Sequence, residues 1–444
     1  MIVETVKRLS SLGEVIAGSK EEEKLVRLVK EVLEEGSDDV RVIPTEVLSW
    51  KEKAVSVDCD ARAVALAYSP SGRGNAKIVE VRSLFDIPKE YMKAVDSGEE
   101  AVAFTLNDGT LRRFVIKYGE LLQYTGKPPP IPAVFLSKRP EKEECEIQVE
   151  TEFGVSYGYN VEAVRNGKGD EIVYVTAHHD HFLRGEHDDL AGVAMLKEIV
   201  ATKRTIKLVS LTAEETGCFF DALSWGCGAR QFVRSIKEKP LFVIDLDFPT
   251  KDSRLFVSPG LFKSVSKIVG DTLIVERRPQ AYTNSYAFLR AGIPTITLSP
   301  AEEMPFYHSD LDSVKPEEDG VFRLQAEMVV KIANEAVVSE NETLEDVTTV
   351  IDALPLELRL NLAMGLSLEK YLSTFRMVMT SGRARDRPFG EVIGLTASFF
   401  DNVTIEGLGH FSVPGDEKER MARSKFLANV VHTLVETIER RDNY

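Results

Sequence analysis

The chain has 444 residues, of which 43% are hydrophobic and 28% are charged, a composition typical of a globular protein with roughly two to four domains. Lys and Arg total 55 and Asp and Glu total 71, so the net charge is −16, which excludes a nucleic-acid partner or an anionic membrane surface as the expected ligand. No apolar run approaches the length of about 20 residues that a membrane span needs. The N-terminus has no basic segment followed by a long apolar core, so we predict no signal peptide and a cytoplasmic protein.

The first strong helix signal lies in residues 19–36. Ser19 and Glu22 have the spacing of a capping box, apolar residues recur on one face, and Gly36 follows the last turn. We assign residues 1–46 to an N-terminal helical part of the main domain.

Short β-type runs punctuated by Gly, Pro, Asn and Asp follow in residues 47–150. The proline-rich stretch 127–132 is incompatible with a helix interior or a central strand. These runs predict a small β-rich domain.

Strands and helices alternate in residues 151–340. Nearly all-apolar strands are expected at 172–177, 206–212, 241–246 and 295–298, and such strands suit a sheet that is buried on both faces. The predicted fold class is therefore α/β, with a mixed, mostly parallel sheet and helices on both faces. Residues 341–444 are predicted to be a helix-rich extension, which is compatible with either a homo-oligomer contact or a cap over the cleft.

Histidine and acidic residues gather where these strands end. The chain has seven histidines, and four of them fall in the stretch AHHDHFLRGEHDDLAGVA directly after the first strand of the set. Acidic residues or a histidine follow the other three strands as well. Because ligands bind outside the carboxyl ends of parallel strands, we expect these side chains to meet at one edge of the sheet.

This set of residues suits a pair of divalent metal ions. One bridging carboxylate and two further ligands for each ion require five residues, and five are available. They are His178, Asp188, Glu215, Asp247 and His308. Glu214 is left beside the ligands as a general base, and Asp180 is expected to hold the imidazole of His178 in the correct tautomer.

The motifs and their order resemble those of the co-catalytic di-zinc aminopeptidases of the bacterial leucyl aminopeptidase and glutamate carboxypeptidase type. The matching segments are His178-His179-Asp180, Gly185 to Gly192 (GEHDDLAG), Glu214-Glu215-Thr216-Gly217, Asp247 at its strand end, and Tyr307-His308 through Asp312. The resemblance covers about residues 155–335, and the β-rich region resembles the protease-associated domain that is often inserted in this family.

The resemblance implies a role for each residue of the set. Asp188 would bridge two metal ions, most simply Zn²⁺, with Co²⁺ or Mn²⁺ as alternatives. His178 and Asp247 would complete one site, and Glu215 and His308 the other. A hydroxide bridging the metals would attack the scissile carbonyl of a peptide, and Glu214 would move the proton to the leaving amine. The implied protein is a metallo-exopeptidase, most simply an aminopeptidase that releases N-terminal residues.

Two features depart from the family pattern. Asn284 stands where many relatives carry Asp, and the ten residues 218–227 intervene after the Glu-Glu motif. This insertion is expected to form part of the substrate pocket wall through Phe219, Phe220 and Trp225, to which we add Tyr286. A disulfide between Cys218 and Cys227 and an ordinary packed loop are both open alternatives, and so is a disulfide between Cys59 and Cys145.

Three other functions remain open at this point. A carboxypeptidase would need a cation for the substrate carboxylate, for which Arg184 and Arg230 are available. A cyclase that uses a single metal fits the same fold. A non-catalytic, receptor-like binding protein is the alternative from another class, although the chain keeps all five ligands and the base.

Overall fold

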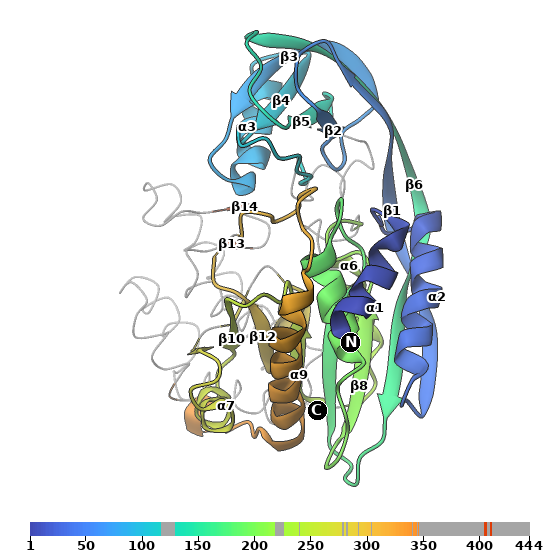
Figure 1. Ribbon diagram of the computed structural model, residues 1–444, viewed down its shortest axis with the longest axis vertical. Helices are drawn as coiled ribbons and strands as arrows, with labels where there is room; N and C mark the ends of the chain where they lie inside the picture. The colour runs from blue at the N-terminus through green and yellow to red at the C-terminus, as the bar shows by residue number, and fades with distance from the viewer. Residues whose placement is uncertain are drawn as a thin grey trace, which may run out of the picture.

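The computed structural model describes residues 1–116, 129–217, 226–238, 240–277, 279–280, 283–291, 293–302, 304–339, 341–343 and 345, together with the backbone of residues 404–405 and 409–410. Two lobes share a twelve-stranded sheet, and the long strands β1 and β6 run from one lobe into the other (Figure 1). The strand order is β11-β10-β12-β9-β7-β8-β6-β3-β4-β5-β2, with β1 paired antiparallel to β6 outside this path.

The first of these lobes, called here the α/β lobe, contains the four strands expected from the sequence. Strands β12, β9, β7 and β8 run parallel to one another, and β6 and β10 flank them in antiparallel pairings. Its strands are β7 (Ile172–His178), β8 (Thr205–Leu211), β9 (Pro240–Leu246), β10 (Ser253–Val257), β11 (Val275–Glu276) and β12 (Thr295–Pro300).

Helices cover both faces of this sheet, because side chains that alternate along each strand enter different cores. Val173 and Val175 of β7 face the core with α1, α2, α5 and α9, whereas Tyr174 faces the core with α6 and α8. The mixed, mostly parallel α/β sheet predicted from the sequence is thereby confirmed. The helical segments are α1 (Ile2–Leu9), η1 (Ser10–Leu12), α2 (Lys20–Glu34), η3 (Glu186–Ala191), α5 (Gly192–Leu196), α6 (Cys227–Ser235), α7 (Phe262–Val269), α8 (Ser285–Arg290), η4 (Pro316–Glu318) and α9 (Asp319–Glu335).

The predicted capping box at the start of α2 is only half formed. Ser19 accepts a hydrogen bond from the backbone N–H of Glu22 at 3.1 Å. The carboxylate of Glu22 is instead fully buried and accepts the N–H of Gly18, the N–H of Tyr159 and the hydroxyl of Thr212. Glu22 therefore joins α2 to β6 and to the loop after β8, a long-range role that local spacing does not predict.

The second lobe, called here the upper lobe, consists of residues 58–143 and the adjoining ends of β1 and β6. It has its own apolar core, to which Trp50, Tyr91, Phe104 and Phe135 contribute. Its elements are β1 (Asp39–Val57), β2 (Ala63–Ala65), β3 (Gly72–Glu80), η2 (Leu84–Asp86), α3 (Ile87–Asp96), β4 (Ala101–Thr105), β5 (Ala133–Leu136) and β6 (Glu144–Arg165). The predicted domain boundaries at residues 47 and 150 fall within β1 and β6, so two shared strands rather than linkers connect the lobes.

A disulfide joins Cys59 and Cys145 where β1 ends and β6 begins. Cys227 is a free, buried cysteine, and Cys218, its predicted alternative partner, lies outside the described residues. Most of the predicted helix-rich extension, residues 341–444, also lies outside them. Within it the structure describes two paired strands, β13 (Thr404–Ile405) and β14 (Gly409–His410).

No helix in the described ranges has both the length and the apolar character that crossing a membrane requires.

Candidate metal centre and active site

The five predicted metal ligands come together at the carboxyl edge of the parallel strands. His178 is the last residue of β7, Asp247 directly follows β9, and Glu215 lies in the loop after β8. His308 lies in the loop between β12 and α9, and Asp188 lies in η3. Parallel strands end at the same edge of a sheet, so five residues that are distant in sequence converge.

Asp188 is shared between two groups of candidate ligands. Its Oδ1 lies 3.3 Å from Nε2 of His178, and its Oδ2 lies 3.3 Å from Nε2 of His308. His178, Asp188 and Asp247 offer ligand atoms that all lie within 4.8 Å of one another, and so do Asp188, Glu215 and His308. This is the division into two sites that the family resemblance implies, with Asp188 as the carboxylate between them.

The turn that carries Asp188 is held from several directions. A Cβ on Gly185, which has a φ of +51°, would lie 2.3 Å from the His181 side chain, and one on Gly192 would lie 2.4 Å from the Asp189 carboxylate. The two glycines of the GEHDDLAG motif therefore allow close packing on each side of the turn. The Asp189 carboxylate accepts the backbone N–H of His178 and of Phe248, both at 3.1 Å.

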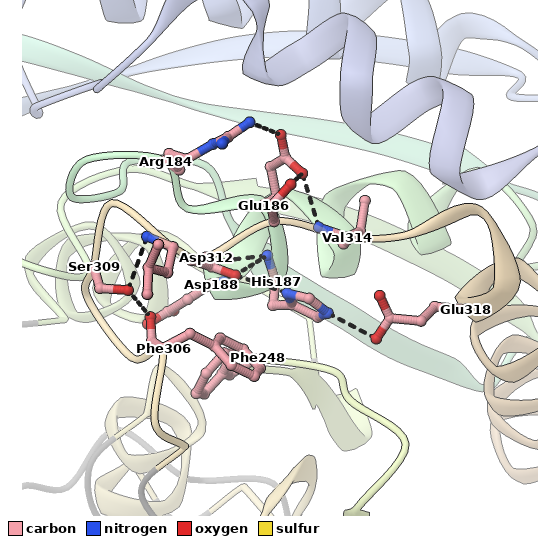
Figure 2. A network of polar contacts seen from close by, with 12 residues as sticks. Arg184, Glu186, His187, Asp188, Phe248, Phe306, Ser309, Asp312, Val314 and Glu318 are labelled. Atoms are coloured by element: carbon pink, nitrogen blue, oxygen red, sulfur yellow. Dashed lines mark hydrogen bonds and ion pairs between the residues drawn. The ribbon is translucent and has the colours of Figure 1, made fainter. Parts of the chain in front are cut away.

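Asp312 also holds this turn, and Figure 2 shows its contacts with His187. Its carboxylate accepts the backbone N–H of His187 at 3.0 Å and that of Asp188 at 3.1 Å. It also contacts Nδ1 of His187 at 2.7 Å, while Nε2 of His187 lies 3.1 Å from Glu318 in η4. Sequence analysis placed Asp312 in a motif but gave it no role, and its contacts show that it positions the peptide before a candidate ligand.

Asp180 acts differently from the expectation. The ring Nδ1 of His178 contacts the backbone carbonyl of Asp180 at 2.9 Å, and the nearer carboxylate oxygen lies 4.0 Å away. The carboxylate instead accepts the backbone N–H of Glu214 at 2.9 Å and of Glu215 at 3.2 Å. Asp180 thus positions the loop with the candidate base and one candidate ligand, because its carboxylate bonds the loop after β8 rather than the ring of His178.

Burial and crowding of carboxylates dominate the electrostatics of this edge. Burial, with the charges of neighbouring carboxylates, raises the pKa of Asp180 to about 7 and the pKa of Glu214 and Asp247 well above their ordinary values. Burial alone would lower the pKa of His308, but the charges of Glu215 and Asp188 raise it to about 10. Without a bound cation these carboxyl groups therefore favour their protonated forms, and bound cations would stabilise the charged forms.

The predicted pocket residues are only partly described. Phe219, Phe220 and Trp225 lie outside the described residues. Tyr286 is buried in α8, whose first N–H, from Ser285, donates to Asp245 two residues before Asp247. That Tyr286 lines the substrate pocket stays a prediction.

Asn284, which departs from the family pattern, directly precedes α8. It is fully buried, and neither Oδ1 nor Nδ2 has a hydrogen-bond partner within the described part of the chain.

Tyr307 and Phe114 lie beside the candidate ligands, although sequence analysis assigned neither a role. The Tyr307 ring stacks on His308 with centroids 3.7 Å apart, and the Phe114 ring lies 5.6 Å from His308. Burial and the charges of Asp188 and Glu215 raise the pKa of Tyr307 well above its ordinary value, so its phenol stays protonated. Tyr307 was signalled by its place in the motif, whereas Phe114 comes from the upper lobe and carries no sequence signal.

Comparisons with known proteins agree with this geometry. Residues 160–333 match peptidase family M28, and a comparison with curated proteins found no match. The fold is similar to that of BSAP, a zinc aminopeptidase from Bacillus subtilis, with a TM-score of 0.56, 18% identity, and coverage of 74% of this chain and 93% of that one. An aminopeptidase from Aneurinibacillus sp. strain AM-1 is also similar, with a TM-score of 0.51, 19% identity, and coverage of 76% and 94%.

A third similar structure is a peptidase M28 precursor from Shewanella amazonensis SB2B, with a TM-score of 0.58, 18% identity, and coverage of 76% of this chain and 94% of that one. Residues 160–333 thus form a peptidase family M28 domain. This confirms the resemblance that the sequence motifs indicate, and it makes the chain a hydrolase of the peptidase class.

Proposed function

We propose that the chain is a zinc-dependent aminopeptidase that releases N-terminal residues from peptides. The observation that supports this most directly is the sharing of Asp188 between His178 on one side and His308 on the other, with Glu214 adjacent in sequence to the ligand Glu215. The names of the Bacillus and Aneurinibacillus structures, both aminopeptidases, support the same reaction.

The residues present fit two zinc ions. Imidazole nitrogens and carboxylate oxygens are ligands that zinc prefers, and four of the five residues are buried while Asp247 is partly buried. Oε1 of Glu215 is buried and has no hydrogen-bond partner among the described residues, as expected for an atom that binds a cation. Zinc bound at such a site polarises the scissile carbonyl and makes water a better nucleophile.

The remaining steps belong to side chains of this chain. Glu214 takes a proton from the attacking water and returns it to the leaving amine. Asp180 orients Glu214 and Glu215 through their backbone N–H groups. The protonated phenol of Tyr307, beside His308, can donate a hydrogen bond to the oxygen on which charge develops.

One contact weighs against the carboxypeptidase alternative. Arg184, one of the two cations available for a substrate carboxylate, pairs with Glu186 at 3.4 Å and points along the outside of the Asp188 turn (Figure 2). Dipeptides blocked at either end would separate the two reactions. An aminopeptidase cleaves only substrates with a free amino terminus, and turnover of N-blocked substrates would contradict the proposal.

The central test is Glu214→Gln in the zinc-loaded full chain. We expect the variant to keep its zinc content, measured by atomic absorption, and to lose turnover of aminoacyl anilides by about 10²–10⁴-fold, because the proton acceptor is removed. Glu327→Gln, the same change at an exposed position of α9, is the matched control and should leave the rate unchanged. Wild-type turnover should disappear on chelation. A Glu214→Gln rate close to that of the wild type would disprove the assigned base.

A further inference from the structure

The upper lobe reaches the loop that carries His308. The backbone N–H of Arg113 donates to the carbonyl of His308 at 3.0 Å, and Leu111 and Asp310 exchange two hydrogen bonds of 3.1 Å each. The side chain of Arg112 donates to the carbonyl of Pro305 at 2.7 Å. A segment of the upper lobe therefore pairs with the backbone on both sides of a candidate metal ligand.

Aromatic rings continue this contact outward from His308. Phe114 lies 5.6 Å from the His308 ring and 5.4 Å from Phe85. Phe85 in turn stacks at 6.4 Å on Tyr307, which stacks on His308. We call Phe85, Phe114 and Tyr307 the ring wall. Two of its three members belong to the upper lobe, so the family motifs of the α/β lobe do not define it.

The members of the ring wall differ in exposure, which suggests different roles. Phe114 is 4% exposed and supports the His308 ring, whereas Phe85 is 37% exposed on η2. A substrate whose scissile carbonyl lies at the metal centre must place its N-terminal side chain within a few ångströms of His308. The exposed surface of the ring wall is aromatic, and it can bind an apolar side chain because apolar surface is removed from water on contact.

The two arginines of the same segment are buried and paired with carboxylates. The Arg113 guanidinium is buried and pairs with Glu14 at 2.7 Å and Glu52 at 3.0 Å. It does not compete with an apolar ligand at the ring wall. The neighbouring Arg112 is likewise paired with Asp108 at 2.7 Å.

We propose that the ring wall receives the side chain of the substrate's N-terminal residue, and that Phe85 makes the chain prefer large apolar residues over small ones. Substrate preference is then set by the upper lobe across from the metal centre. This proposal rests on the proposed aminopeptidase function.

The test compares Phe85→Ala and Phe85→Leu in the zinc-loaded full chain, using phenylalanyl, leucyl and alanyl anilides. We expect Phe85→Ala to lower kcat/KM for the phenylalanyl substrate about tenfold relative to the alanyl substrate, since the lost contact is apolar. Phe85→Leu should fall between Phe85→Ala and the wild type. Val155→Ala, which truncates an apolar side chain that is 64% exposed on β6, is the control and should not change the ratio.

A binding measurement makes the test independent of turnover. Calorimetry with free L-phenylalanine and L-alanine should show tighter binding of phenylalanine to the wild type and loss of that difference in Phe85→Ala. If Phe85→Ala is active and its ratio of kcat/KM for the phenylalanyl and alanyl anilides equals that of the wild type, the role of Phe85 is overturned and the aminopeptidase function stays intact. If the wild type has no peptidase activity but binds phenylalanine more tightly than alanine, and Phe85→Ala loses this difference, the proposed function is contradicted and the ring wall is supported. Equal binding of the two amino acids by the wild type would overturn the ring wall.

Discussion

The two lobes bury charge in different ways. At the edge of the α/β lobe, Asp188, Glu214 and Glu215 are buried close together, and burial raises the pKa of Glu214 and Glu215. In the upper lobe, the buried guanidinium of Arg113 has two carboxylate partners, and it lies 5.1 Å over the ring of Trp50. The carboxylates of the first site can be balanced by a bound cation, whereas the guanidinium of Arg113 is already neutralised by carboxylates of the chain itself.

This difference indicates that the carboxylates of the α/β lobe serve function, whereas the ion pairs of Arg113 serve stability. Buried charge is costly unless it is paired, so a bound cation would stabilise an edge on which carboxylates are crowded. The Arg113 guanidinium needs no ligand, because Glu14 from the α/β lobe side and Glu52 from β1 already pair with it. Metal removal should therefore affect the first site, and breaking an ion pair should affect the second.

Arg113→Met should give the largest loss of stability. The change leaves Glu14 and Glu52 without their cation, and removing one partner of a buried pair costs about 3–5 kcal/mol. Urea unfolding of the zinc-loaded chain measures the loss. Arg73→Met is the matched control in the same lobe, because the pair of Arg73 with Glu146 is exposed and such pairs contribute little. Equal losses in the two variants would contradict the distinction between the lobes.

Removing the disulfide should have a smaller effect on the same lobe. The bond between Cys59 and Cys145 closes a loop with a sequence separation of 86 and fastens the ends of β1 and β6. Replacing both residues with Ser should lower the free energy of unfolding by about 2–4 kcal/mol, because the unfolded chain gains conformational freedom. Reductant should lower the Tm of the wild type but not that of the double variant. A wild-type Tm that reductant leaves unchanged would show that the bond does not stabilise the protein in solution.

The same contrast explains how far the sequence predicts the structure. The strand that ends at His178 and the strand that Asp247 directly follows are apolar runs with a strong local signal. The rule that parallel strands share a carboxyl edge then brings the ligands together. Neither step requires knowledge of long-range contacts.

Contacts between distant segments could not be predicted in this way. Glu22 has the spacing of a local cap, yet its carboxylate binds Thr212 and Tyr159, because a buried acceptor is satisfied by whichever donors the tertiary fold brings to it. Phe114 is one apolar residue in a short β-type run, and nothing local indicates that it contacts His308. The upper lobe's part in the site therefore emerges only from the structure.

The smallest effect expected here concerns Asp312, which acts on the metal centre through the backbone. In Asp312→Asn, one acceptor oxygen becomes an amide donor that faces the N–H groups of His187 and Asp188, so the turn loses part of its support. Loss of such outer contacts weakens metal binding by about tenfold or more. Zinc affinity should be measured by competition with a chromophoric chelator, since this readout does not depend on turnover.

Glu318→Gln provides the matched comparison for Asp312→Asn. Glu318 accepts the backbone N–H of Lys315 at 2.7 Å and contacts Nε2 of His187 at 3.1 Å, so it stands one step further from Asp188 than Asp312 does (Figure 2). We therefore expect a smaller loss of zinc affinity than in Asp312→Asn. If Asp312→Asn lowers the Tm but binds zinc as tightly as the wild type, Asp312 supports the fold alone. If the two variants lose affinity equally, the ring of His187 rather than the backbone of Asp188 transmits the effect.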